Sequence, residues 1–296
     1  MNASPGTDMP YSNRYINELV NRETSLLPLK REICRALKEL LDCVTSGGKL
    51  LVCGNGGSAA DAEHIVGELM KGFMLPRTLG DGQLRKLANL FPALADEMRA
   101  HLQHAIPAIS LVGGVALNTA FINDVGADYV FAQQVLGLGR PGDILWGLST
   151  SGNSVNVVRA FQVARASGLR TLAFTGKNGG ALAALSDTEI RVPQQETYRI
   201  QELHLQIYHA LCADMEENLF GEGRAGLGAS GCPRPRRHAR KHPRTRRFPR
   251  SGAKVCQKRG AAAREIIFQG SLNRPILTKN SHSGNVVCTQ ARSQPH

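Results

Sequence analysis

The sequence of 296 residues has no CxxC pair and no long uninterrupted apolar run. Its seven cysteines are odd in number, which argues against a thiolate metal site and favours a reducing compartment. The first residues lack the charged and then apolar pattern of a secretion signal. The mostly apolar stretch 105–122 predicts no membrane span, because it is broken by Pro107, Gly113, Gly114 and Asn118. We therefore expect a cytoplasmic protein.

Acidic residues are scarce in the last quarter of the chain. Residues 221–296 hold 17 of the 36 Lys and Arg but only two of the 24 acidic residues, a net charge of +15 against −3 for residues 1–220. Prolines interrupt this segment and little of it is apolar, so we expect a disordered tail. It could be a solvated appendage, an out-of-frame or read-through terminus without function, or, least favoured, a basic arm that touches nucleic acid or an anionic surface. The basic character belongs to the tail and does not make the whole chain a nucleic-acid binder.

The remaining residues alternate between short apolar runs and helical patterns. Residues 1–48 predict helices over 15–27 and 31–44, whose apolar stripes would pack on a body or on another subunit. The apolar runs predict five strands, over 49–53, 108–112, 143–148, 170–174 and 189–192. The helical patterns between and after them cover 58–73, 117–123, 129–138, 155–167, 180–185 and 198–219. An insertion at 76–104 adds a helix over 84–103. Strands that alternate with helices indicate an α/β fold over 49–220, with a parallel, doubly wound sheet.

Glycines and hydroxyls follow two of these strands where a helix begins. The first junction, 53–58, reads CGNGGS, in which the glycines let the backbone approach an anion and Ser58 can cap the helix. A plain tight turn is the alternative. The spacing also satisfies the weak GxGxxA dinucleotide fingerprint, but no strand ending in an acid follows about 20 residues later, so we set a dinucleotide aside.

The second junction, 148–154, reads LSTSGNS and places four hydroxyls around one helix start. Ser154 could be a simple N-cap and the rest a polar loop, but four hydroxyls exceed what capping requires. Hydroxyls and free backbone N–H groups at one point favour a phosphate monoester. No lysine of the GxxxxGK[ST] type is present, so a nucleoside triphosphate is less favoured.

Two pairs of polar residues could carry chemistry near these junctions. His64 and Glu68 are four apart on one predicted helix and therefore share a face. Gln201 and His209 are eight apart on the last helix, about 80° from each other around its axis. Each could be an ordinary surface or structural residue. Together they could bind a divalent ion or move protons, although the spacing does not establish that they meet.

Residues from about 30 to 220 resemble the sugar isomerase (SIS) domain, and within it the phosphoheptose isomerases. The resemblance rests on 53–64 (CGNGGSAADAEH), 149–154 (STSGNS), 175–180 (TGKNGG) and 199–204 (RIQELH). It implies interconversion of sedoheptulose 7-phosphate and D-glycero-D-manno-heptose 7-phosphate, a step in making heptose for lipopolysaccharide and other surface polysaccharide. It also implies homotetramers with sites at subunit boundaries.

The resemblance assigns roles to residues position by position. It implies one zinc ion per subunit held by His64, Glu68, Gln201 and His209, with Glu68 as the base and His209 as the acid. It implies phosphate binding by Ser149, Thr150, Ser151 and Ser154. The remaining substrate contacts would come from Asn55, Gly56, Gly57, Ser58, Glu68, Asp124 and Gln201.

The sequence also departs from the family pattern. Gly113 and Gly114 stand where polar or ionic residues are common, Tyr198 replaces a small or acidic residue, and Lys71-Gly72 replaces a Gly-Arg pair. These positions leave the exact sugar open. The competing function is a non-catalytic SIS scaffold that binds a protein partner, as in the initiator-associating protein of bacterial replication. Retention of both polar pairs favours the enzyme, and no helix-turn-helix pattern precedes residue 48 to suggest a regulator.

Overall fold

The computed structural model describes residues 11–221, all of which lie in one compact unit. The predicted basic tail, apart from Gly221, lies outside these residues. The described chain forms a five-stranded, all-parallel sheet in the order β2-β1-β3-β4-β5, so the predicted α/β fold is confirmed. The strands are β1 (Leu50–Gly54), β2 (Ala108–Ser110), β3 (Ile144–Leu148), β4 (Arg170–Thr175) and β5 (Thr188–Arg191).

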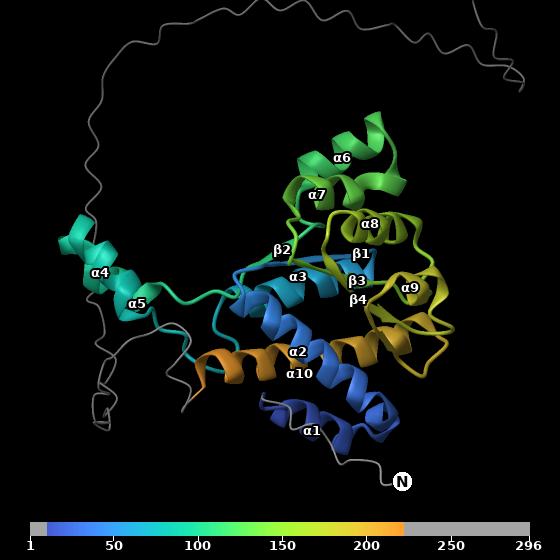
Figure 1. Cartoon of the computed structure of the whole chain (residues 1–296), viewed down its shortest axis with the longest axis horizontal. Helices are drawn as coiled ribbons and strands as arrows, with labels where there is room; N and C mark the ends of the chain where they lie inside the picture. Colours follow the sequence, from blue (N-terminus) through green and yellow to red (C-terminus); the bar gives the residue numbers. More distant parts are fainter. Residues whose placement is uncertain (1–10, 222–296) are drawn as a thin grey trace, which may run out of the picture. The chain divides into compact units, whose positions relative to one another are not determined.

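Helices cover both faces of the sheet, as Figure 1 shows. The α-helices are α1 (Arg14–Arg22), α2 (Lys30–Thr45), α3 (Gly57–Met70), α4 (Asp81–Leu90), α5 (Ala95–His101), α6 (Val115–Asp124), α7 (Val130–Leu138), α8 (Val155–Ala166), α9 (Gly180–Leu185) and α10 (Thr197–Phe220). Short 3₁₀ helices are η1 (Thr24–Leu29), η2 (Pro92–Leu94) and η3 (Ala127–Tyr129). No helix in the described part of the chain is long and apolar enough to cross a membrane.

Two hydrophobic cores lie on opposite faces because side chains alternate along each strand. In β1, Leu50 and Val52 join the core shared with α1, α2, α3 and α10, whereas Leu51 and Cys53 join the core shared with α7 and α8. Every residue of β1 and β3 is buried, as expected for central strands of a sheet covered on both faces. The four described cysteines are all buried and unpaired.

Two predicted helices are interrupted, and a proline accounts for the break in the second of them. The helix predicted over 15–27 ends at Arg22, and the 3₁₀ helix η1, which contains Pro28, follows it. The helix predicted over 84–103 is split into α4, η2 and α5 at Pro92. Proline has no N–H to donate and disfavours helical geometry in the residue before it, here Phe91 with φ −137° and ψ 66°.

Candidate active site

The two glycine- and hydroxyl-rich loops lie side by side at the carboxyl edge of the sheet. Gly54, the last residue of β1, is paired in register with Leu148, the last residue of β3. The chain passes from β1 to β2 on one side and then to β3 on the other, so this edge is the topological switch point where ligands bind in such sheets. Asn55 and Asn156 join the loops by reciprocal amide hydrogen bonds of 2.8 and 3.0 Å. Sequence reasoning missed Asn156, because nothing in its spacing pointed to the first loop.

The hydroxyl loop is arranged for a ligand rather than for helix capping. Ser154 occupies the N-cap position of α8, yet its side chain makes no capping hydrogen bond. Its hydroxyl instead contacts the Ser149 hydroxyl at 3.0 Å, and Ser149 is buried. Thr150 and Ser151 are half-buried beside them. In the first turn of α8 the Val157 N–H donates to Asn156 Oδ1 at 3.0 Å, which leaves the N–H groups of Val155 and Asn156 to meet an anion next to this hydroxyl cluster.

Glycines let the hydroxyl loop pack directly on the loop before α9. Gly152 has φ +66°, and a Cβ built there would lie 1.9 Å from the Gly179 carbonyl oxygen. The Gly152 carbonyl accepts a hydrogen bond from the Leu182 N–H, and the Thr150 carbonyl accepts one from the Gly176 N–H. The shape of the hydroxyl loop thus depends on the absence of a side chain at Gly152.

We expect Gly152→Ala to destabilise the protein and to raise the KM for a phosphorylated substrate. The left-handed conformation alone costs a non-glycine residue about 1–3 kcal/mol, and relieving the Cβ contact must also displace the loop. Denaturant unfolding and steady-state kinetics measure the two effects. Gly137→Ala is the matched control, because Gly137 lies in α7 with open space where the added methyl group would lie, and it should gain about 0.5–1 kcal/mol. Wild-type stability and KM in the Gly152 variant would contradict this account.

The acid–base candidates meet where α3 packs on α10. His64 Nε2 lies 3.1 Å from Glu68 Oε1 and 3.4 Å from His209 Nε2. The rings of His64 and His209 are in edge contact, with centroids 4.9 Å apart. Partial burial lowers the pKa of His209, and the neighbouring His64 adds to that shift. The structure therefore brings together, within one chain, two segments that the sequence could only place on separate helices.

Lys71 is an unpredicted member of this group. Its ammonium lies 3.0 Å from Glu68 Oε2, on the carboxylate oxygen that His64 leaves free. The Glu68 side chain is only 13% exposed, so little water separates its carboxylate from its two partners, His64 and Lys71. Sequence reasoning noted Lys71 only as a departure from the family pattern.

Gln201 lies apart from the two histidines, at the other end of α3. A Cβ at Gly57 would come within 2.6 Å of Gln201 Nε2, so the amide packs on the first turn of α3 beside the CGNGGS loop. His209 follows eight residues later, about 12 Å along α10. Among residues 11–221, no group of three or more His, Cys, Asp or Glu side chains is arranged to hold a metal ion. His64 contacts Glu68 and His209 directly instead.

The other residues singled out in the sequence lie outside this contact cluster. Asp124 is exposed at the end of α6, where its carboxylate accepts a hydrogen bond from Asn123. Tyr198 is 57% exposed, and its hydroxyl accepts a hydrogen bond from Arg199. Gly113 lies close to the Glu63 carboxylate. His204 is fully buried, donates to the Thr175 carbonyl at 3.0 Å and has its pKa lowered to about 4 by burial, so it is a neutral core residue.

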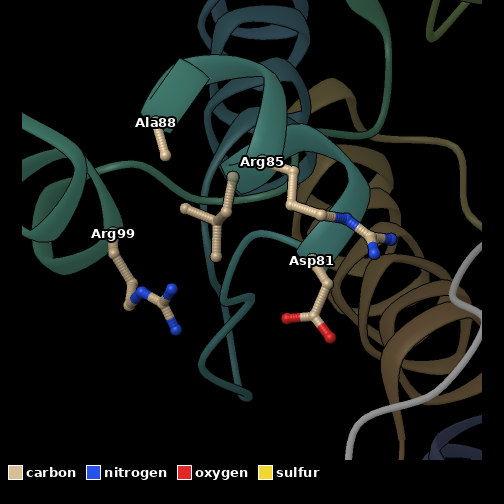
Figure 2. Close-up of a pocket in the computed structure, with 5 residues that line it drawn as sticks. Asp81, Arg85, Ala88 and Arg99 are labelled. Carbon is tan, nitrogen blue, oxygen red and sulfur yellow. The ribbon is translucent and has the colours of Figure 1, made fainter. Parts of the chain in front are cut away.

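An open pocket of about 230 Å³ lies on the insertion, away from these residues. Figure 2 shows its lining, which comes from Asp81, Leu84, Arg85, Ala88 and Arg99. None of these residues was predicted to act in the site, and both arginines are exposed. We therefore place the candidate site at the switch point and the α3–α10 contact, not in this pocket.

Comparison with known proteins gives the class of the chain first. The model of the SIS domain family matches residues 14–88 and 89–176. The chain therefore belongs to the SIS-domain family.

Named relatives then narrow the group. A phosphoheptose isomerase of Shewanella sp. (strain ANA-3) is 39% identical over 195 residues, which cover 65% of this chain and 86% of the relative. One from Crocosphaera subtropica is 42% identical over 200 residues, with 66% and 88% covered. The solved phosphoheptose isomerase of Neisseria gonorrhoeae has a TM-score of 0.54 at 33% identity and covers 69% of this chain and 95% of its own. That of Francisella tularensis has a TM-score of 0.55 at 32% identity, with 69% and 96% covered. The resemblance to phosphoheptose isomerases is confirmed, and with it the assignment of the chain as a sugar-phosphate isomerase.

Proposed function

We propose that this enzyme interconverts sedoheptulose 7-phosphate and D-glycero-D-manno-heptose 7-phosphate in the cytoplasm, as a step in making heptose for lipopolysaccharide. The contact between the α3 and α10 side chains carries the proposal, because it pairs the Glu68 carboxylate with an imidazole on the helix that begins at the CGNGGS loop. The named relatives support the choice of sugar. In this proposal the phosphate is held by the Ser149, Thr150, Ser151 and Ser154 hydroxyls and by the start of α8.

The chemistry is a proton transfer between neighbouring carbons. Glu68 removes the proton from the carbon next to the carbonyl, and the C–H electrons form the enediolate double bond. His209 gives a proton to the carbonyl oxygen. The protonated Glu68 then returns its proton to the former carbonyl carbon, while the hydroxyl on the neighbouring carbon gives its proton to His209 and becomes the new carbonyl. Burial lowers the pKa of His209, which makes its protonated form a stronger acid but a smaller share of the enzyme at neutral pH. Asn55, Gly56, Gly57, Ser58, Gln201 and Asp124 are the proposed contacts to the sugar.

Zinc is part of this proposal, since the donor types at the α3–α10 contact suit it. Two imidazoles and a carboxylate are typical zinc ligands, but among the described residues His64, Glu68 and His209 contact one another and are not arranged around a common point, so a zinc ion here requires these side chains to turn. Bound zinc would supply a Lewis acid that polarises the carbonyl. A carboxylate held tightly by a metal is a weaker base, so the two roles of Glu68 compete. Because Gln201 packs on Gly57 of its own chain, we propose that a second copy completes the ligand set.

We further propose that the enzyme is a homotetramer. Helix α6 buries none of its side chains although it is largely apolar, and Val115 and Val125 are 71% and 69% exposed. Apolar surface of this kind is typical of subunit interfaces. In size-exclusion chromatography with light scattering, we expect the wild type to elute as a tetramer. The double variant Val115→Asp and Val125→Asp should elute as smaller species. Glu63→Gln, on the exposed side of α3, is the control. A wild-type monomer at micromolar concentration would refute the proposal.

The decisive experiment is incubation with sedoheptulose 7-phosphate, with and without added zinc, followed by detection of the aldose. Unphosphorylated sedoheptulose tests the hydroxyl loop, and a six-carbon ketose phosphate tests the length of the sugar. We expect aldose from the heptulose phosphate, stimulated by zinc, and little from either control. No aldose from folded, zinc-treated enzyme would overturn the proposal and favour the scaffold function, whose readout is a bound protein partner.

A further inference from the structure

Two asparagine side chains join the CGNGGS loop to the start of α8. Asn55, in that loop, donates from Nδ2 to Asn156 Oδ1 at 2.8 Å, and Asn156, in the first turn of α8, donates from Nδ2 to Asn55 Oδ1 at 3.0 Å. The two residues follow the paired ends of β1 and β3, so the asparagine pair spans the switch point of the sheet. It therefore links the loop proposed to contact the sugar to the helix whose start is proposed to hold the phosphate.

A backbone N–H determines which way round the two amides lie. The Val157 N–H donates to Asn156 Oδ1 at 3.0 Å, so turning the Asn156 amide by half a turn would set two donors against each other. The orientation of Asn156 in turn fixes that of Asn55, which must offer Nδ2 to Asn156 Oδ1 and Oδ1 to Asn156 Nδ2. The orientation of the Asn55 amide is thus imposed by α8 and not by its own loop.

The remaining hydrogen-bonding groups of the pair show what it can offer to a ligand. An asparagine amide has two N–H donors and two lone pairs on its oxygen. Asn156 Oδ1 already accepts two hydrogen bonds, one from Asn55 and one from Val157. Each amide keeps one N–H that has no partner within residues 11–221, and of the two oxygens only Asn55 Oδ1 keeps a free lone pair. The pair is therefore mainly a donor, which suits a ligand rich in oxygen acceptors, such as the hydroxyl chain of a sugar phosphate.

We infer that Asn156 is a positioning residue, which holds the Asn55 amide in the orientation that the sugar chain of the substrate requires. This inference rests on the proposed function, in which Asn55 contacts the sugar and the hydroxyl loop holds the phosphate. Asn55 is exposed, and no other side chain in the described part of the chain hydrogen-bonds to its amide. Without Asn156 that amide would be free to rotate, and ordering it again on binding would weaken the affinity for the sugar. Asn156 acts through Asn55, so it is not itself catalytic.

The test is ligand affinity, measured on the full chain by isothermal titration calorimetry with two probes. Sedoheptulose 7-phosphate reports on the sugar and the phosphate together, whereas inorganic phosphate reports on the hydroxyl loop alone. We expect Asn156→Ala to weaken binding of the sugar phosphate about 10-fold, a loss typical of two partly exposed hydrogen bonds. Binding of inorganic phosphate should stay close to that of the wild type, because the substitution keeps the backbone N–H groups at the start of α8.

A double substitution separates positioning from direct contact with the ligand. If Asn156 acts only through Asn55, the double variant Asn55→Ala and Asn156→Ala should bind the sugar phosphate no more weakly than Asn55→Ala alone, because residues that act as a unit are not additive. Asn17→Ala is the matched control. It also removes an amide-to-amide hydrogen bond, of 2.9 Å to Asn13, but does so on α1, on the opposite face of the sheet from α8. It should leave both affinities unchanged.

Unchanged affinity for the sugar phosphate in Asn156→Ala would overturn the inference. An equal loss of affinity for inorganic phosphate would also overturn it, since Asn156 would then shape the hydroxyl loop. A further loss in the double variant would do the same, because it would indicate that Asn156 contacts the ligand directly. A wild type that binds the sugar phosphate but forms no aldose would count against the proposed reaction alone, whereas a wild type that binds neither probe would overturn both.

Discussion

Glu68→Gln should lower kcat for heptulose phosphate isomerisation by about 10²- to 10⁴-fold, the usual contribution of a general base. The substitution keeps the shape of a side chain that is only 13% exposed, but an amide cannot take the substrate proton. The hydroxyl loop, which is proposed to hold the phosphate, is built from other residues, so KM should change little. Equal losses in kcat and kcat/KM would show that the lost interaction belongs to the transition state.

The control for this variant is another glutamate on the same helix. Glu63 is exposed on α3 and has no part in the contact with α10, so Glu63→Gln should retain wild-type kcat. Zinc content must be measured beside kcat, because Glu68 is also a proposed ligand. A fully active Glu68→Gln enzyme would remove Glu68 from the base role. A loss of activity that extra zinc restores would make Glu68 a ligand rather than the base.

The fold could be predicted from the sequence because the burial of each strand determines the pattern of apolar residues along it. Strands such as β1 and β3 are buried on both faces and therefore read as short continuous apolar runs. The insertion was harder to predict, since its helices bury little. Leu84 is the only buried side chain of α4, and α5 has none, so local signals decided where those helices break. Pro92 carried that signal, and it outweighed the helical pattern on either side of it.

The site was predicted unevenly for a similar reason. A loop that follows a strand can be recognised in the sequence by its glycines and hydroxyl side chains. A contact between two helices cannot, because it depends on how the helices cross. The meeting of His64 with His209 and the addition of Lys71 follow from the packing of α3 on α10, which no spacing encodes. The angle between Gln201 and His209 around the axis of α10 allowed the two side chains to lie together. Their separation along the helix, however, places Gln201 beside Gly57.

The largest expected effect on stability comes from Glu216, which is fully buried in α10. Its two carboxylate oxygens accept hydrogen bonds from the backbone N–H groups of Phe73, Met74 and Leu75, at 2.6–2.9 Å, and from Arg77 Nε at 2.6 Å. Arg77, also buried, donates onward to the carbonyls of Leu69 and Glu68 at the end of α3. This buried clamp fixes the chain just after Glu68.

Glu216→Gln should therefore cost about 3–5 kcal/mol, the usual result of breaking a buried ion pair from one side. The amide has one accepting oxygen for four donors, and it leaves the Arg77 charge unpaired. Since native proteins are stable by only about 5–15 kcal/mol, the denaturant midpoint should fall sharply at a fixed protein concentration. Glu217→Gln, one residue further along α10 and outside the clamp, should change stability by less than about 0.5 kcal/mol.

Replacing both charged partners separates the ion pair from the backbone contacts. In Glu216→Met combined with Arg77→Met no charge is left unpaired, and buried pairs are often replaced by apolar residues at little cost. Here, however, the N–H groups of Phe73, Met74 and Leu75 would lose their acceptor, as would the α3 carbonyls their donor. We therefore expect the double variant to remain destabilised and to lose kcat through displacement of Glu68. Recovery of wild-type stability in the double variant would show that the charge pair alone, and not the turn it organises, makes the clamp necessary.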